Sequence, residues 1–140
     1  MIFAEGDDPR VLRAAVAWQR GGLGRALVVG READVAEKLA AEGMADAVRE
    51  LEVVSALTSP HLNAYHETLY KRLQRQGVDR EDALKLARRD RHVFAALMLA
   101  HGHGDALVTG PSGHNLNDFR ALAVGWSVWG AAGVTPTVTN

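Results

Sequence analysis

The chain has 140 residues, of which 47% are hydrophobic and 24% charged, as expected for one globular domain. Its formal net charge of −1 argues against nucleic acid or an anionic membrane as a partner, and no apolar run approaches the roughly 20 residues of a membrane span. The absence of cysteine excludes disulfides, thiolate metal sites and thiol catalysis, and the acidic N-terminus is unlike a signal peptide, so we expect a cytoplasmic protein.

Strand and helix patterns alternate from the first residue. A short apolar run at 2–4 predicts a strand, and Asp8 before Pro9 predicts a helix start with an N-cap and a proline in the first turn. Glycines at 21–24 end this helix. An uninterrupted apolar run at 26–29 then indicates a strand buried on both faces, as in parallel sheets.

A second helix is predicted over 31–42, where apolar residues recur at helical spacing, and a third strand over 51–54. The alternation up to this point is βαβαβ. Such an order favours a parallel sheet with right-handed crossovers.

Three helices are predicted next, and capping residues mark their starts. Ser59 and Pro60 open the first, Asp79 caps the second, and the third begins near Asp90. A strand over 106–109 and a final helix follow. We therefore predict an α/β fold with a mostly parallel sheet covered by helices on both faces.

The turn after this last strand is a candidate anion site. The strand ends at Thr109, and a helix begins near Asn115, so backbone N–H groups and a helix N-terminus lie where α/β proteins hold anions. Thr109 and Ser112 are candidate hydroxyl donors, and Arg120 could grip a phosphate with two hydrogen bonds. His114 either donates a hydrogen bond to an acyl or phosphate group or is a surface histidine in a turn.

Three motifs that suggest other chemistry do not fit. The glycines at 21–24 precede a strand, whereas a dinucleotide-binding loop follows one. The turn at 110–113 lacks the Gly-Lys-Ser/Thr ending of a P-loop, which argues against NTP hydrolysis. Ser112 is not in a nucleophile elbow, because His114 occupies the position of the second glycine.

The histidines do not have the spacing of a metal site. His61 and His66 are five residues apart instead of four, His101 and His103 are two apart, and no His-Glu-x-x-His motif occurs. We therefore predict no metal ligands.

Residues 60–91 carry more basic than acidic side chains. The favoured interpretation is a solvated helix face, and the alternative is a surface that attracts a small polyanionic ligand. Trp126 and Trp129 favour core or interface packing over base stacking.

Five segments share residues with one enzyme family. FAEGDDPRVLRAA at 3–15, ALVVGR at 26–31 and FAALMLAHGHGDALVTG at 94–110 resemble corresponding stretches of phosphate acetyl/butyryltransferase (phosphotransacetylase) domains. YHETLY at 65–70 and QGVDREDA at 76–83 are similar to the variant fused to bacterial NADP-dependent malic enzymes.

The resemblance implies a three-layer αβα fold of the isocitrate/isopropylmalate dehydrogenase type, truncated here to one partial domain over 1–140 with an atypical tail at 125–140. It implies acyl transfer between coenzyme A and phosphate, with CoA, acetyl-CoA, acyl phosphate and phosphate as ligands and no tightly bound cofactor. The positions that match the family's phosphate-contacting turn and arginine are Thr109, Ser112, His114, Asn115 and Arg120.

The family's catalytic Ser-Arg pair and aspartate belong to a C-terminal part that these residues do not match. A second family arginine falls on Leu73, as in the malic-enzyme branch. We therefore assign no catalytic residue and expect no acyl transfer by the chain alone. The alternatives are an acetyl-CoA- or CoA-sensing regulatory domain of a malic enzyme, or a remnant without function. A homodimer and a malic enzyme domain are the expected protein partners.

Overall fold

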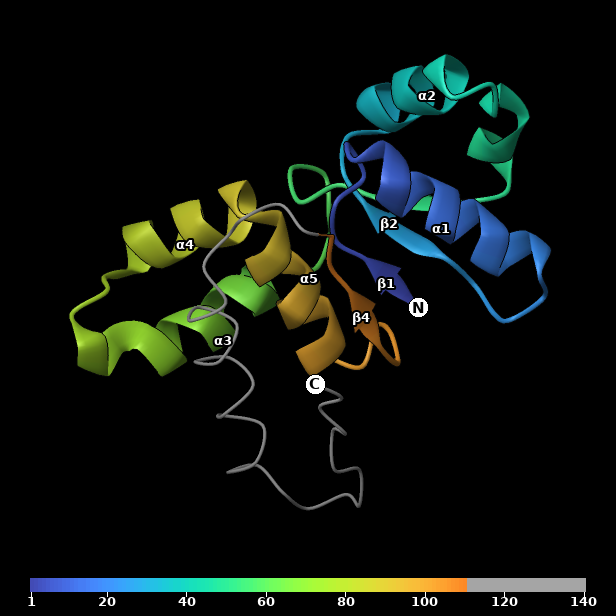
Figure 1. Ribbon diagram of the computed structural model, residues 1–140. Helices are drawn as coiled ribbons and strands as arrows, with labels where there is room; N and C mark the ends of the chain where they lie inside the picture. Colours follow the sequence, from blue (N-terminus) through green and yellow to red (C-terminus); the bar gives the residue numbers. More distant parts are fainter. Residues whose placement is uncertain (111–140) are drawn as a thin grey trace.

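The computed structural model describes residues 1–110 and contains one parallel sheet (Figure 1). Its strands are β1 (Ile2–Phe3), β2 (Leu27–Val29), β3 (Glu52–Val54) and β4 (Leu107–Val108). The order across the sheet is β3-β2-β1-β4. In β1, Ile2 is level with Leu27 on one side and with Leu107 on the other. The first strand is therefore central.

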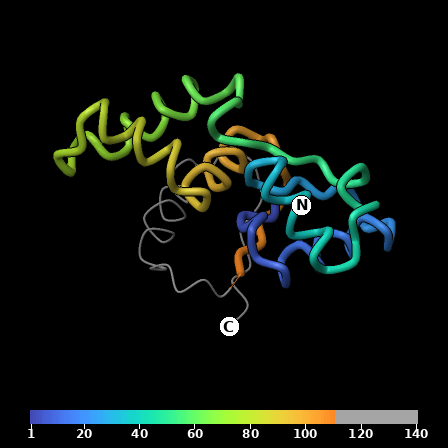
Figure 2. The backbone as a smooth tube through the Cα atoms, turned by 90° about the horizontal axis from the view of Figure 1, so that it is seen from above, coloured from blue at the N-terminus to red at the C-terminus, as the bar shows by residue number. Residues whose placement is uncertain are grey.

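Helices cover the two faces of this sheet, which gives the three layers that the sequence predicts (Figure 1). They are α1 (Pro9–Arg20), α2 (Glu32–Ala41), the 3-10 helix η1 (Ala45–Arg49), α3 (Leu62–Leu73), the 3-10 helix η2 (Gln74–Gln76), α4 (Arg80–Arg89) and α5 (Arg91–Ala100). Viewed from above, α3 and α4 project to one side of the strands and α1 and α2 lie on the other (Figure 2). Within residues 1–110, no helix has the length and apolar character needed to cross a lipid bilayer.

Of the four helix starts predicted from a capping residue, three are confirmed, because local side-chain chemistry defines them. Asp8 accepts a backbone N–H at the start of α1, with Pro9 as the first helical residue. Asp79 and Asp90 cap α4 and α5 in the same way. Gly77 ends η2 in the left-handed conformation, with φ of 85°.

The predicted start of α3 is wrong by two residues. The Ser59 hydroxyl accepts the N–H of His61 at 3.2 Å, and the helix begins only at Leu62. A serine bonded to the amide two residues ahead closes a turn, and Pro60 lies inside that turn. The hydroxyl therefore does not cap the helix.

The core has one layer on each face of the sheet. The layer under α1 and α2 is built around Phe3, Val11, Leu12, Ala15, Val16, Val28, Val35 and Leu39. The layer under α3 and α5 is built around Ile2, Ala4, Val29, Tyr65, Leu69, Phe94, Leu97 and Met98. Neighbouring residues of β1 and β2 thus enter opposite layers, as strand geometry requires.

Candidate functional site

The carboxyl ends of β1 and β4 define the candidate site. From β1 the chain turns towards β2 and β3 on one side, whereas β4 pairs with the other side of β1. The direction of strand order therefore reverses between these two strands. Open α/β sheets bind ligands outside the carboxyl ends of their strands at such a switch point. Glu5 and Gly6 follow β1 here, and Thr109 and Gly110 follow β4.

Glu5 is a buried carboxylate at this switch point, with 2% of its surface exposed. Its Oε1 lies 3.2 Å from Nε2 of His92, and its Oε2 accepts the backbone N–H of Gly110. A buried carboxylate without partners would carry a large desolvation cost, which these contacts offset. The side chain joins the ends of β1 and β4 to the start of α5.

The imidazole of His92 lies between two carboxylates. Its side chain is 12% exposed, and its Nδ1 is 3.5 Å from Oδ1 of Asp90, the residue that caps α5. Beside it, Asp7 forms an ion pair with Arg91. The loop that leaves β1 is thus attached to the first turn of α5 by Glu5 and Asp7.

Asp8 occupies the N-terminus of α1. Its carboxylate accepts the backbone N–H of Arg10 at 2.8 Å and the guanidinium of the same residue at 2.7 Å. The hydrogen bond from the Arg10 side chain lowers the pKa of Asp8 from 3.8 to about 2. The first turn of α1 already holds a carboxylate, so it is not an open anion site.

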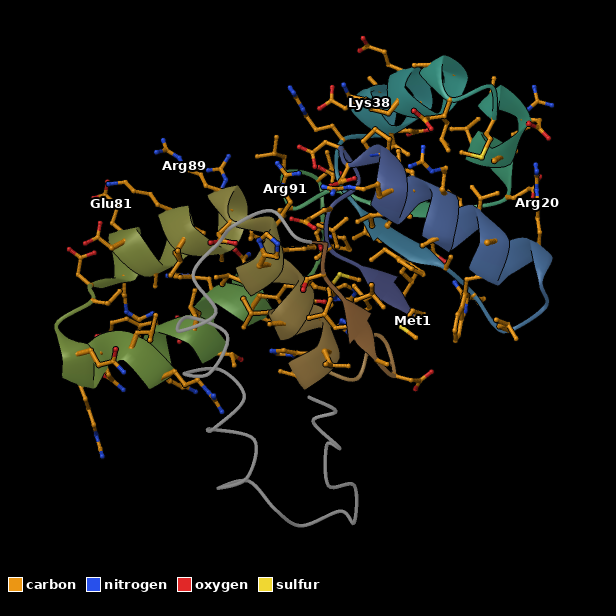
Figure 3. All side chains as sticks on the ribbon, viewed as in Figure 1. Met1, Arg20, Lys38, Glu81, Arg89 and Arg91 are labelled. Carbon is orange, nitrogen blue, oxygen red and sulfur yellow. The ribbon has the colours of Figure 1, made fainter. Side chains whose placement is uncertain are left out.

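Two depressions flank the Glu5–His92 pair. One, of about 510 Å³, is lined by Glu5 and the start of α1. The other, of about 410 Å³, lies between α4 and α5, and it is lined by three cations, Lys85, Arg89 and Arg91, and by the carboxylates of Asp82 and Asp90. Figure 3 shows Arg89 on the end of α4 and Arg91 on the start of α5. Part of the basic segment predicted from the sequence is therefore gathered next to the switch point.

Of the predicted site residues, the structure places Thr109 at the carboxyl end of β4, where it is exposed. The N–H of the next residue, Gly110, donates to Glu5 and is not available to an anion, which differs from the sequence expectation for this turn. The predicted residues outside the described residues are Ser112, His114, Asn115 and Arg120, together with Trp126 and Trp129.

The Glu5–His92 pair is not among the residues predicted from the sequence. An acidic residue directly after a short buried strand was an available signal for Glu5. Nothing local marks His92 as its partner, because 87 positions separate the two residues.

A second cluster gathers three histidines around the ring of Tyr65. The rings of His61 and His103 have centroids 4.2 Å apart, and the Tyr65 hydroxyl is hydrogen-bonded to Nδ1 of His103. The Thr68 hydroxyl lies 2.8 Å from Nε2 of His101. These residues come from the start of α3 and the end of α5.

Burial raises the pKa of Tyr65 to about 12. Burial also lowers the pKa of His101, with smaller effects from His103 and His61. Across residues 1–110, no group of three or more His, Cys, Asp or Glu side chains is arranged to hold a metal ion. His66 lies apart, with its Nε2 2.7 Å from the carbonyl oxygen of Arg80.

Comparison with known proteins gives the family to which the chain belongs. The sequence profile described as phosphate acetyl/butaryl transferase matches residues 1–123, and the chain belongs to this family. An NADP-dependent malic enzyme of Rhizobium meliloti is 39% identical over 110 residues, covering 79% of this chain and 14% of the enzyme. A phosphate acetyltransferase of Clostridium acetobutylicum is 32% identical over 110 residues, 79% of this chain and 32% of that protein.

Solved structures agree with this assignment. A phosphotransacetylase from Streptococcus pyogenes matches with a TM-score of 0.75 and 25% identity, covering 89% of this chain and 36% of its own. A Staphylococcus aureus phosphotransacetylase with 24% identity has the same fold, at a TM-score of 0.74. The chain thus forms a phosphotransacetylase-like domain of the kind found in malic enzymes, and it spans well under half the length of these relatives.

Proposed function

We propose that the chain binds an acyl-CoA or acyl phosphate at the β1–β4 edge and forms one wall of a phosphate acyltransferase site. The observation that carries the proposal is the position of Thr109. Thr109 belongs to the predicted phosphate-contacting turn and lies at the switch point of the sheet. The chain that forms this sheet belongs to the phosphate acetyl/butaryl transferase family.

Each group at this edge has a role in the proposal. The Thr109 hydroxyl donates a hydrogen bond to a phosphate oxygen, and Glu5 accepts the Gly110 amide, which ties the end of β4 to the end of β1. Arg89, in the depression between α4 and α5, attracts the phosphates of coenzyme A. Of the residues outside the described part, Arg120 supplies the guanidinium.

Titration calorimetry of the 140-residue chain with acetyl-CoA, CoA and acetyl phosphate, each in a separate experiment, tests this binding. We expect Thr109→Val to weaken binding about tenfold, because it removes one hydrogen bond to a charged group. Thr58→Val is the matched control, since Thr58 is also exposed and lies beyond the far edge strand β3. No binding of any of the three ligands at millimolar concentration contradicts the proposal.

We further propose that the chain alone binds without transferring the acyl group. Formation of acetyl-CoA from acetyl phosphate and CoA, followed by thioester absorbance, should stay at the uncatalysed rate. Turnover at an enzyme-like rate that is lost in Arg120→Gln would show instead that the chain is itself a transferase.

A regulatory function is the second candidate, and the 39% identity to a malic enzyme favours it. In this case the ligand is acetyl-CoA or CoA, and a malic enzyme domain is the partner. Exchanging the matched segment of the Rhizobium meliloti enzyme for its counterpart in this chain separates the candidates. A regulatory domain makes malate oxidation respond to acetyl-CoA, and Thr109→Val in the exchanged segment weakens the response. A domain that only takes part in acyl transfer leaves malate oxidation unaffected by acetyl-CoA.

A further inference from the structure

Three imidazoles gather where the start of α3 meets the end of α5, two helices that pack on each other (Figure 1). His61 directly precedes α3, His101 directly follows α5, and His103 lies in the turn after it. The ring centroids of His61 and His103 are 4.2 Å apart, and those of His101 and His103 are 6.0 Å apart. The centroid of the Tyr65 ring lies 4.9 Å from that of His101 and 5.7 Å from that of His103. The three imidazoles therefore surround one tyrosine of α3.

The contacts of this cluster join α3 to α5. The ring of Tyr65 packs edge-on against that of Phe94, with centroids 5.3 Å apart. The Thr68 hydroxyl lies 2.8 Å from Nε2 of His101, and the Tyr65 hydroxyl is bonded to Nδ1 of His103. The start of α3 is thus held against the end of α5 by an apolar contact and by two hydrogen bonds to imidazoles.

One of these hydrogen bonds requires a neutral imidazole. Tyr65 is 1% exposed, and burial raises its pKa to about 12, so its hydroxyl keeps its proton at neutral pH and donates to Nδ1 of His103. An imidazolium carries a hydrogen on both ring nitrogens and cannot accept a hydrogen bond. Protonation of His103 therefore removes the acceptor of a buried hydroxyl, which is unfavourable.

Among residues 1–110, no carboxylate forms an ion pair with any of the three imidazoles, and the histidine–carboxylate contacts belong to His92, at the other end of α5. The titratable and charged groups on the elements around the cluster are the N-terminal ammonium of Met1, Arg25, Glu52, His66, Glu67, Lys71, Arg72, Arg80 and Asp105. Glu52 is paired with Arg25 and Glu67 with Arg80. Asp105 is exposed, so water and salt screen its charge. A proton bound by the cluster is therefore not stabilised by an ion pair.

The imidazoles also oppose one another's protonation. Burial lowers the pKa of His101, and the charges of His103 and His61 lower it further. The folded chain thus binds a proton at His101 more weakly than the unfolded chain does. The resulting contribution to stability is complete above the usual pKa of 6.5 and is lost as the pH falls through the lowered pKa of the folded state.

We propose that His61, His101 and His103 form a proton-sensitive clasp between α3 and α5. The clasp is closed while its imidazoles are neutral, and the Tyr65 hydroxyl then has its acceptor. Proton uptake below about pH 6.5 separates the start of α3 from the end of α5, while the sheet and the helices on its other face stay folded. The proposal does not depend on ligand binding at the β1–β4 edge.

Hydrogen exchange of the 140-residue chain, followed by NMR and expressed as protection factors, tests the clasp. Two amides report on it: that of Tyr65, which donates to the His61 carbonyl at 3.0 Å, and that of His103, which donates to the Met98 carbonyl at 2.9 Å. The reference is the Val35 amide of α2, on the other face of the sheet. From about pH 7.5 to about pH 5.5 we expect the protection of both reporters to fall about tenfold relative to the reference.

Variants assign this effect to the imidazoles. In the double variant His101→Gln with His103→Gln, each amide oxygen can accept a hydroxyl hydrogen bond, and neither amide binds a proton near neutral pH. Its reporter protection should change by less than about twofold over the same pH range. His66→Gln is the matched control, because His66 is a histidine of α3 whose Nε2 contacts the Arg80 carbonyl outside the clasp. It should keep the full pH dependence.

Three results would each overturn the proposal. In the first, the reporters keep their protection relative to Val35 at the lower pH, so protons do not open the clasp. In the second, all three amides lose protection together, which means that the whole chain unfolds. In the third, the double variant keeps the pH dependence or His66→Gln loses it, which assigns the effect to other groups. The first two need no variant and remain decisive if the double variant does not fold.

Discussion

Glu5 and Asp8 both follow β1, three positions apart, and have different surroundings. Glu5 is buried and contacts groups more than 80 positions away in the sequence, His92 and the Gly110 amide. Asp8 has its contacts with Arg10, two residues ahead. The first carboxylate holds the tertiary structure of the site, and the second defines the start of a helix.

Replacing Glu5 by Gln tests the first of these roles. The amide of Gln has one acceptor oxygen in place of two, so it can accept from only one of the two partners. We expect Glu5→Gln to lower the free energy of unfolding by about 2–3 kcal/mol. Urea unfolding at pH 7 measures this loss, with Glu37→Gln on the exposed face of α2 as the control. An upfield shift of the Gly110 amide proton should accompany it, and a loss within about 0.5 kcal/mol would contradict the role of Glu5.

The pKa of Asp8 predicts a pH dependence with a definite sign. Because its pKa in the folded chain is about 2 and its usual value 3.8, the carboxylate binds protons more weakly in the folded state. Its contribution to stability is complete above pH 3.8 and is lost as the pH falls towards 2.

The stability difference between the wild-type chain and Asp8→Asn should therefore be constant at pH 5–6 and shrink towards pH 2, as measured by urea midpoints. Arg10→Gln should reduce the same pH dependence, since the hydrogen bond from the Arg10 side chain is the largest cause of the shift. A difference that stays the same down to pH 2 would exclude this ionisation as its source.

At the scale of helices, α2 is attached to the sheet by few side chains. Val35 and Leu39 are its completely buried residues, and both pack in the layer with Leu12 and Val28. The helix has no side-chain cap at its N-terminus, where Arg31 stands. Its position therefore depends on packing.

Truncating Leu39 should show this dependence directly. We expect Leu39→Ala to lower the free energy of unfolding by about 2–5 kcal/mol, because it leaves a cavity under the helix. Leu57→Ala is the control, since Leu57 is 56% exposed and should cost no more than about 0.5 kcal/mol. Thermal unfolding followed by circular dichroism measures both, and equal losses would contradict the packing argument.

The sequence predicted those elements whose causes are local. Asp8, Asp79 and Asp90 cap helices through amides within a few residues, and all three starts are confirmed. Ser59 failed as a cap because a hydroxyl can equally bond the amide two residues ahead and close a turn. Both outcomes are local, and the residue type alone does not choose between them.

The site was less predictable, because its contacts are not local. Thr109 followed from the pattern of a strand and a turn. Burial of Glu5 against His92 requires that β1 and β4 pair side by side, and a single sequence contains no direct signal for that pairing. The same pairing brings the Gly110 amide to Glu5, so this N–H is no longer available as a donor to an anion.

At the scale of the whole molecule, strand order determines which amides are best protected. β1 has a strand on each side, whereas β3 has a neighbour on one side only. The Ala4 amide donates to Val108 at 3.1 Å, and the Glu52 amide of β3 donates to Ala26 at 3.2 Å. Hydrogen exchange followed by NMR should find the Ala4 amide slower than that of Glu52. Equal rates would mean that the whole sheet opens as one unit.

The central position of β1 also has a consequence for synthesis. The ribosome makes β1 first. It makes β4, which pairs with the second edge of β1, about a hundred residues later, which takes roughly 5–20 s. Until then one edge of β1 has no strand to pair with and is open to pairing with other nascent chains. Glu5 directly follows β1, and acidic side chains next to an unpaired strand edge discourage such pairing. The residue that joins the ends of β1 and β4 in the folded chain therefore stands beside the edge that stays open until β4 has been made.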